Sequence, residues 1–162
     1  MESGSGLLGA IEQSWLGVAA RESVWLYPSA NVGHILGLMI LAGSIALIDA
    51  RLLGAFREMA PGPFLRVGRR FAIAGLLTML LTGSVLFAAE ATHVSANLIF
   101  QTKLALIGTA LANVLLFELF VARQVRIGIA GVTMPVAARL SAALSLGLWL
   151  GVATAGRLIA YF

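Results

Sequence analysis

Two histidines have the most specific chemistry in this chain. His34 stands near the start of an apolar run that continues to residue 48. An ionisable side chain at membrane depth is costly and indicates a function, and histidine is also the commonest metal ligand. His93 lies at the end of the second apolar run. Histidines on neighbouring helices could hold haem iron or copper, and the chain has no cysteine for covalent haem attachment, so a haem would be b-type.

Four further polar residues could complete such a site. Lys103 and Arg157 could pair with haem propionates, and Asn31 and Gln101 are expected at the same end of the apolar runs. Simpler alternatives stay open for each ligand. His34 could be hydrogen-bonded to a neighbouring helix, His93 could be an exposed loop residue, and Lys103 could extend its ammonium to the membrane interface.

The composition predicts the elements that must position these residues. The 162 residues are 60% hydrophobic and 11% charged, whereas soluble domains carry roughly 25% charged residues. A spanning helix needs about 20 mostly apolar residues, and four segments qualify: 29–49, 71–90, 98–121 and 140–160. We therefore predict an all-α protein with a single transmembrane domain, residues 1–162, built as a four-helix up-and-down bundle.

The segment before these spans, residues 1–28, is too polar to cross the bilayer. Leu8, Ile11, Trp15 and Val18 share one face at helical spacing. Tryptophan favours the membrane interface, so we predict an amphipathic helix on the membrane surface that ends near Pro28. The alternative is a fifth, half-buried helix that packs on the bundle.

The basic residues predict the orientation of the bundle. Eleven residues are Lys or Arg, and eight of them fall on the side of the two longer loops: Arg51, Arg57, Arg66, Arg69, Arg70, Arg123, Arg126 and Arg139. The positive-inside rule places this side in the cytoplasm. Both termini are then periplasmic in a bacterial inner membrane, and the basic charge reflects topology and not binding to nucleic acid.

The cytoplasmic end carries its own ionisable set of Asp49, Arg51, Arg70 and Glu118. We expect inter-helix ion pairs there, with a proton-entry role as the alternative. A turn is predicted at residues 61–63, Pro-Gly-Pro, inside the loop 50–70. Glycines 33, 37 and 75 indicate either close helix packing or room for a flat ligand.

Several stretches resemble a known but uncharacterised family of bacterial four-helix membrane proteins: residues 22–28, 34–37, 49–54 and 97–104. More distantly, the layout is similar to CopD-type copper-resistance proteins and to HemJ-type protoporphyrinogen oxidases, which place a histidine in the first span. The HemJ type also has Lys-Leu at the start of its third span, as in Lys103-Leu104. This likeness implies a haem-ligand role for His34 and a supporting role for Lys103.

Three functions follow as expectations. The first is a b-type haem protein that transfers electrons at the periplasmic side, to or from quinone or a periplasmic redox partner. An open iron position would make it a haem-dependent membrane oxidoreductase. The second is a copper-binding or copper-handling protein. The third is a cofactor-free accessory subunit, in a homo-oligomer or a larger membrane complex.

Overall fold

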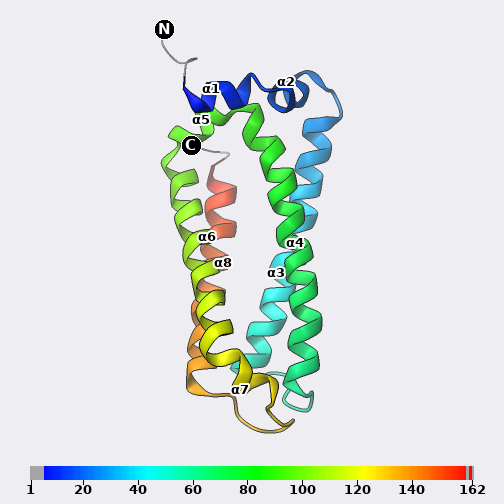
Figure 1. Ribbon diagram of the computed structural model, residues 1–162, viewed down its shortest axis with the longest axis vertical. Coiled ribbons are helices and arrows are strands. Elements are labelled where there is room, and N and C mark those ends of the chain that lie inside the picture. The colour runs from blue at the N-terminus through cyan, green and yellow to red at the C-terminus, as the bar shows by residue number, and fades with distance from the viewer. Residues whose placement is uncertain (1–5, 160, 162) are drawn as a thin grey trace.

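A computed structural model describes residues 6–159 and 161. This part of the chain is helical and contains no strand. Four of its helical segments are long and apolar enough to cross a membrane: α3 (Leu26–Leu53), α4 (Pro61–Ala89), α6 (Leu98–Leu116) with its continuation to Arg126, and α8 (Val136–Leu158). They lie side by side along the long axis (Figure 1). Large apolar side chains on their outer faces are exposed, as a membrane protein requires.

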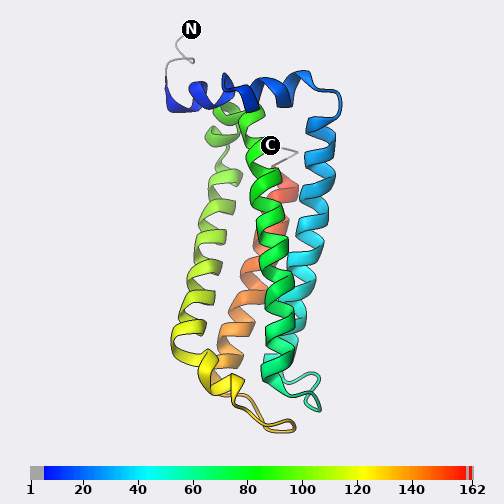
Figure 2. The same cartoon turned by 45° about the vertical axis from the view of Figure 1, so that its right-hand side comes forward.

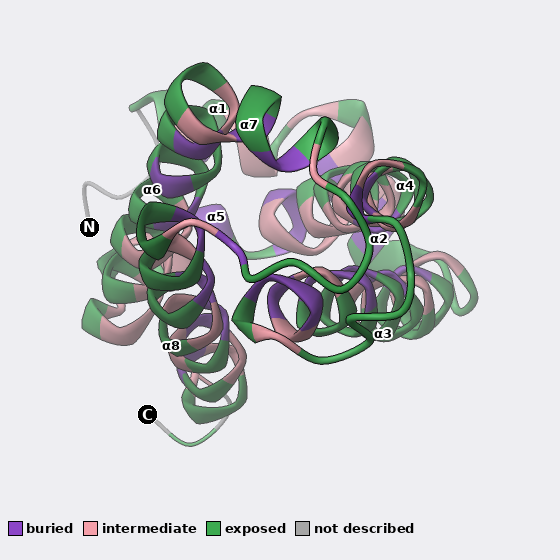
Figure 3. Cartoon of the chain, turned by 90° about the horizontal axis from the view of Figure 1, so that it is seen from below, coloured by how far each residue is buried: buried purple, intermediate pink, exposed green. Residues whose placement is uncertain are grey.

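The four long helices pack as two pairs. α3 packs along α4, and α6 packs along α8, while α3 also contacts α8. Viewed along the helices, the two pairs are separate (Figure 3). In the described part of the chain the backbones of α4 and α6 lie apart, and side chains bridge them, as in the stacked rings of Phe87 and Phe100, whose centroids are 5.7 Å apart. One side of the assembly is therefore less tightly closed than the others.

Glycines close the seam between α3 and α4. A methyl group on Gly75 would lie 2.6 Å from the backbone nitrogen of Leu41, and one on Gly37 would lie 3.2 Å from the Gly75 carbonyl oxygen. Because only hydrogen fits at such distances, the two backbones approach closely. The expectation of close helix packing at these glycines is confirmed.

Three short helices lie across one end of the long ones (Figure 2): α1 (Leu7–Glu12), α2 (Trp15–Glu22) and α5 (Ala91–Ala96). The prediction of one continuous N-terminal helix is wrong, because the chain breaks at Ser14, whose hydroxyl caps α2. Arg21 fixes this layer by donating to the carbonyl oxygens of Glu12 and Ala89, at 2.7 and 3.1 Å. The layer is thus bonded to the end of α4.

Two prolines begin helices where the sequence predicted interruptions. Pro28 lies in the first turn of α3, and Pro61 opens α4. Both sites are allowed because the first-turn N–H groups have no partner within the helix. The predicted turn at residues 61–63 is therefore wrong. α4 also starts well before the expected span at residue 71, since its arginine-rich first turns remain helical.

The third long segment changes its winding before it ends. α6 passes into a π-helix, η1 (Phe117–Val121), and then into α7 (Ala122–Arg126), so the helix extends into the loop predicted from residue 122. A π-turn inserts an extra residue and rotates the residues that follow. Here Phe117 is buried in the core and Glu118 is directed toward α4.

Candidate functional site

His34 bridges the seam between α3 and α4. Its Nδ1 lies 3.0 Å from the hydroxyl oxygen of Thr82. That hydroxyl donates its single proton to the carbonyl oxygen of Thr78, at 2.7 Å. With the hydroxyl proton placed on the Thr78 carbonyl, Nδ1 donates to Thr82, and a neutral His34 carries its proton there. Within the described residues no hydrogen bond engages Nε2, so its lone pair is free to bind a metal.

Gly83 makes room for this ring. A methyl group on Gly83 would lie 3.2 Å from Cε1 of His34. The imidazole of His34 thus contacts two residues of α4 that are adjacent in sequence, Thr82 and Gly83. The expectation that His34 is hydrogen-bonded to a neighbouring helix is confirmed, and it does not conflict with ligation because it leaves Nε2 unused.

Lys103 lies in the second turn of α6, at the same end of the long helices as His34. Its side chain is half-buried and rests on Gly156 of α8, where a methyl group would lie 3.5 Å from Nζ. Among residues 6–159 and 161 no carboxylate forms an ion pair with Lys103. A cation without a counter-ion and a free imidazole nitrogen therefore occupy the same end of the helices.

The other predicted site residues are not gathered around this pair. His93 is exposed on α5, and Asn31 is exposed on α3. Gln101 donates to the carbonyl oxygen of Ser95 at 3.0 Å. Arg157 donates to the Tyr161 hydroxyl at 2.6 Å, and its guanidinium lies 4.9 Å from that ring centroid. The described residues contain no group of three His, Cys, Asp or Glu side chains that could together hold a metal ion.

A second polar region lies toward the other end of the helices, where the loops are arginine-rich. Glu118 forms ion pairs with Arg69 of α4 and Arg126 of α7. The predicted ion pairing is confirmed for Glu118, with Arg69 and not Arg70 as its partner across helices. Arg51 is buried, but it donates to the carbonyl oxygen of Met59, at 2.8 Å from Nη2, instead of pairing with a carboxylate.

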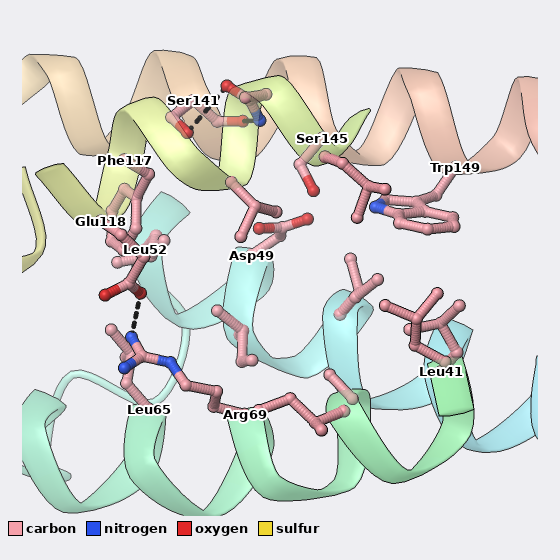
Figure 4. A pocket seen from close by; sticks show the side chains of 18 residues that line it. Leu41, Asp49, Leu52, Leu65, Arg69, Phe117, Glu118, Ser141, Ser145 and Trp149 are labelled. Atoms are coloured by element: carbon pink, nitrogen blue, oxygen red, sulfur yellow. Dashed lines mark hydrogen bonds and ion pairs between the residues drawn. The ribbon is translucent and has the colours of Figure 1, made fainter. Parts of the chain in front are cut away.

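Beside the Glu118 ion pairs the four long segments enclose a cavity of about 160 Å³. Most of its lining is aliphatic (Figure 4). Asn113 and Ser141 exchange two hydrogen bonds at one wall, at 3.0 and 3.1 Å, so both of these side chains are satisfied. The cavity is therefore mainly apolar, with a few polar groups at fixed positions.

Two buried polar atoms of this cavity have no partner. Asp49 is 4% exposed and Trp149 is 9% exposed. In the residues that the structure describes, neither Oδ2 of Asp49 nor Nε1 of Trp149 has a hydrogen-bond partner. The predicted ion pair of Asp49 is wrong, and the Ser145 hydroxyl faces its carboxylate instead (Figure 4). Leaving such a group unsatisfied costs about 1–3 kcal/mol.

Sequence reasoning did not identify Trp149 as a site residue. It stands between Gly147 and Gly151, in a stretch that indicates packing. The signal that could have found it is its position: a buried tryptophan usually needs a partner for its N–H, and Ser145 lies one helical turn before it. The placement of Trp149 and Asp49 in the lining of one cavity depends on helix rotation, which hydropathy does not encode.

The chain was then compared with known proteins. Residues 7–162 match the model of DUF6644, a family of unknown function. The chain belongs to this family. Comparison with curated proteins gave no match, and comparison with solved structures gave none either. The expected membership of an uncharacterised family is confirmed, and DUF6644 brings no activity that could be assigned to the two sites.

Proposed function

We propose that this DUF6644 protein is a membrane-embedded b-type haem protein that transfers electrons at the periplasmic side. The observation that carries the proposal is the hydrogen-bonding of His34. Its Nδ1 is occupied by Thr82, and its Nε2 is unused within the described part of the chain. Metal-binding histidines characteristically donate their other ring N–H to a neighbouring group, which fixes the tautomer and the ring orientation.

The residues near His34 fit a haem in chemical type. Nε2 of His34 would bind the iron, Thr82 would orient the imidazole, and Lys103 would pair with a propionate. The sequence also predicts His93 as a second ligand and Arg157, Asn31 and Gln101 as polar contacts of the haem, but the structure does not gather these side chains around His34. The haem supplies one-electron chemistry when bound. If His34 were the sole protein ligand, the haem would also support oxidoreductase chemistry.

Haem is preferred over copper because of ligand number. A haem iron needs as few as one protein ligand, since the macrocycle supplies four. A protein copper site is built from several side chains, such as two histidines and a cysteine. The described residues gather no such group of three. His34 acting alone therefore fits haem better than it fits a copper site.

The same proposal includes a topology. We place the four long helices as an up-and-down bundle in a bacterial inner membrane, with the arginine-rich loops in the cytoplasm and both termini in the periplasm. α1 and α2 would lie at the membrane interface, which is supported by the exposure of Trp15 and Trp25. A distant relationship to CopD-type or HemJ-type proteins belongs to this proposal as well.

Absorption spectroscopy tests the haem. The protein is purified in detergent with haem supplied during expression, and its spectrum is recorded before and after dithionite. We expect a Soret band, with sharp α and β bands on reduction, that His34→Ala abolishes. His93→Ala separates the ligands, because loss of a second axial ligand converts a low-spin spectrum to a high-spin one. A colourless wild-type protein, or a spectrum unchanged in His34→Ala, would overturn the proposal and favour a cofactor-free subunit.

A further inference from the structure

The cavity near Asp49 has the dimensions of a binding site for one small ring. Its volume is about 160 Å³. An apolar cavity of roughly 150 Å³ is large enough to bind benzene. Leu41, Ile45 and Leu76 supply aliphatic walls, and Trp149 supplies an aromatic one. A single six-membered ring therefore fits, whereas a larger fused system does not.

The polar atoms of the cavity define what such a ring must carry. Asp49 presents an acceptor, Oδ2, and Trp149 presents a donor, Nε1. Both are buried and have no partner in the part of the chain that the structure describes. Their side chains flank Ser145 along one wall (Figure 4). A ligand with a hydroxyl group would donate to Asp49, and a ligand oxygen would accept from Trp149, so one molecule could satisfy both atoms.

The route into the cavity indicates a membrane-soluble ligand. The lining includes residues of both α4 and α6, two helices whose backbones lie apart and which meet through side chains such as the stacked Phe87 and Phe100. Ile73, Leu111 and Val114 belong to this lining and are also substantially exposed on the outer surface. In a bilayer this opening faces lipid. Toward the arginine-rich loops the cavity is bounded by the ion pair of Arg69 and Glu118. A ligand would therefore enter sideways, from the hydrocarbon region of the bilayer.

We propose that the cavity binds the ring headgroup of a membrane-soluble quinol. One hydroxyl donates to Oδ2 of Asp49, the ring lies against the aliphatic wall, and an oxygen accepts from Nε1 of Trp149. The lipid-soluble tail leaves between α4 and α6. This ligand is consistent with the electron transfer proposed above, but its binding requires only the cavity and not a haem.

The test is equilibrium binding of tritiated trimethylhydroquinone to purified haem-free protein, kept reduced and measured by scintillation proximity. We expect saturable binding to the wild type. Asp49→Asn, which replaces a carboxylate acceptor by a weaker amide oxygen, and Trp149→Phe, which removes the donor, should each weaken it by about tenfold. Ala72→Leu fills the cavity from α4 and should abolish binding. Trimethylbenzene, which lacks hydroxyl groups, should not compete.

Controls separate this site from the rest of the molecule. Ser84→Ala lies on α4 outside the cavity, where its hydroxyl bonds only to the Leu80 carbonyl, and it should bind like the wild type. His34→Ala should also bind normally, so failure of the haem proposal leaves this one standing. All variants are first checked for a wild-type elution volume and helical content. Absence of saturable binding to the wild type would overturn the proposal. Binding by Ala72→Leu and Asp49→Asn that equals wild-type binding would overturn it as well.

Discussion

The two sides of α4 differ in how they meet their neighbours. Toward α3 the seam is closed by Gly37 and Gly75 and crossed by the hydrogen bond of His34 to Thr82. Toward α6 the backbones lie apart, with the stacked rings of Phe87 and Phe100 at one end and a cavity toward the arginine-rich loops. Helices in lipid gain no hydrophobic free energy by associating, so close contact depends on small residues. Where α4 presents larger aliphatic side chains, the helices remain apart and polar atoms stay unsatisfied.

Widening the closed seam should have the largest effect. In Gly75→Leu the new side chain would begin 2.6 Å from backbone atoms of α3, which cannot move independently of the helix. We expect the free energy of unfolding to fall by about 3 kcal/mol, the upper part of the overpacking range. Unfolding by sodium dodecyl sulfate in mixed micelles measures it.

The matched control is Gly43→Leu. A methyl group on this glycine of α3 meets no described atom within 4 Å. Leucine also has the better helix propensity by about 1 kcal/mol. This variant should therefore be neutral or slightly more stable. If the two leucine variants unfold alike, the seam is not closed by backbone contact at Gly75.

The next largest effect concerns the ion pair of Glu118 with Arg69, which joins η1 to α4. Glu118→Gln leaves Arg69 and Arg126 without their shared counter-ion. These side chains are partly exposed, so we expect a loss of about 2 kcal/mol, between the values for surface and buried pairs. The loss should shrink at high salt, because added ions screen the arginines. Thermal unfolding at two salt concentrations measures it.

Glu58→Gln serves as the comparison for that variant. Glu58 is exposed in the loop between α3 and α4 and forms no ion pair within the described residues. Its stability should match the wild type at both salt concentrations. A loss as large as that of Glu118→Gln would mean that total charge, and not the ion pair of Glu118 with Arg69, determines stability.

The sequence predicted the helices better than the contacts between them. Apolar runs identified all four long segments, because length and hydropathy are sufficient for that purpose. They misplaced the start of α4, since arginines ended the apolar pattern although the helix continued. The π-helix at Phe117 has no sequence signature, yet its extra residue directs Glu118 toward Arg69.

The candidate sites show the same limit. Depth in the membrane follows from position along a helix, so the placement of His34 and Lys103 at the same end of the helices could be anticipated. The rotation of each helix about its own axis could not be anticipated from the sequence. Asp49 and Arg51 were expected in ion pairs, but Asp49 faces the cavity and Arg51 binds a loop carbonyl. Because hydropathy averages over all faces, it cannot say which polar residue meets which.

The cavity between α4 and α6 can be probed at the carboxylate of Asp49. In the absence of ligand, Asp49→Asn should raise the free energy of unfolding by about 1 kcal/mol, because it removes a buried carboxylate whose Oδ2 has no hydrogen-bond partner among the described residues. Denaturation of the ligand-free protein in mixed micelles measures the gain. A gain in stability together with a loss of quinol binding would mark Asp49 as a residue retained for binding. A loss of stability instead would show that Ser145 already satisfies the carboxylate.

The smallest expected effect is at the polar bond across the closed seam. Thr82→Val keeps the shape of the side chain but leaves Nδ1–H of His34 without an acceptor. We expect a loss of about 0.5–1 kcal/mol, the net value of one hydrogen bond. Thr78→Val is the control, because that hydroxyl bonds only to the Ala74 carbonyl of its own helix.

If the haem proposal holds, Thr82→Val should also shift the haem reduction potential, whereas Thr78→Val should not. Equal stability of the two variants would mean that glycine contact alone closes this seam, and that His34 is held by packing and not by its hydrogen bond.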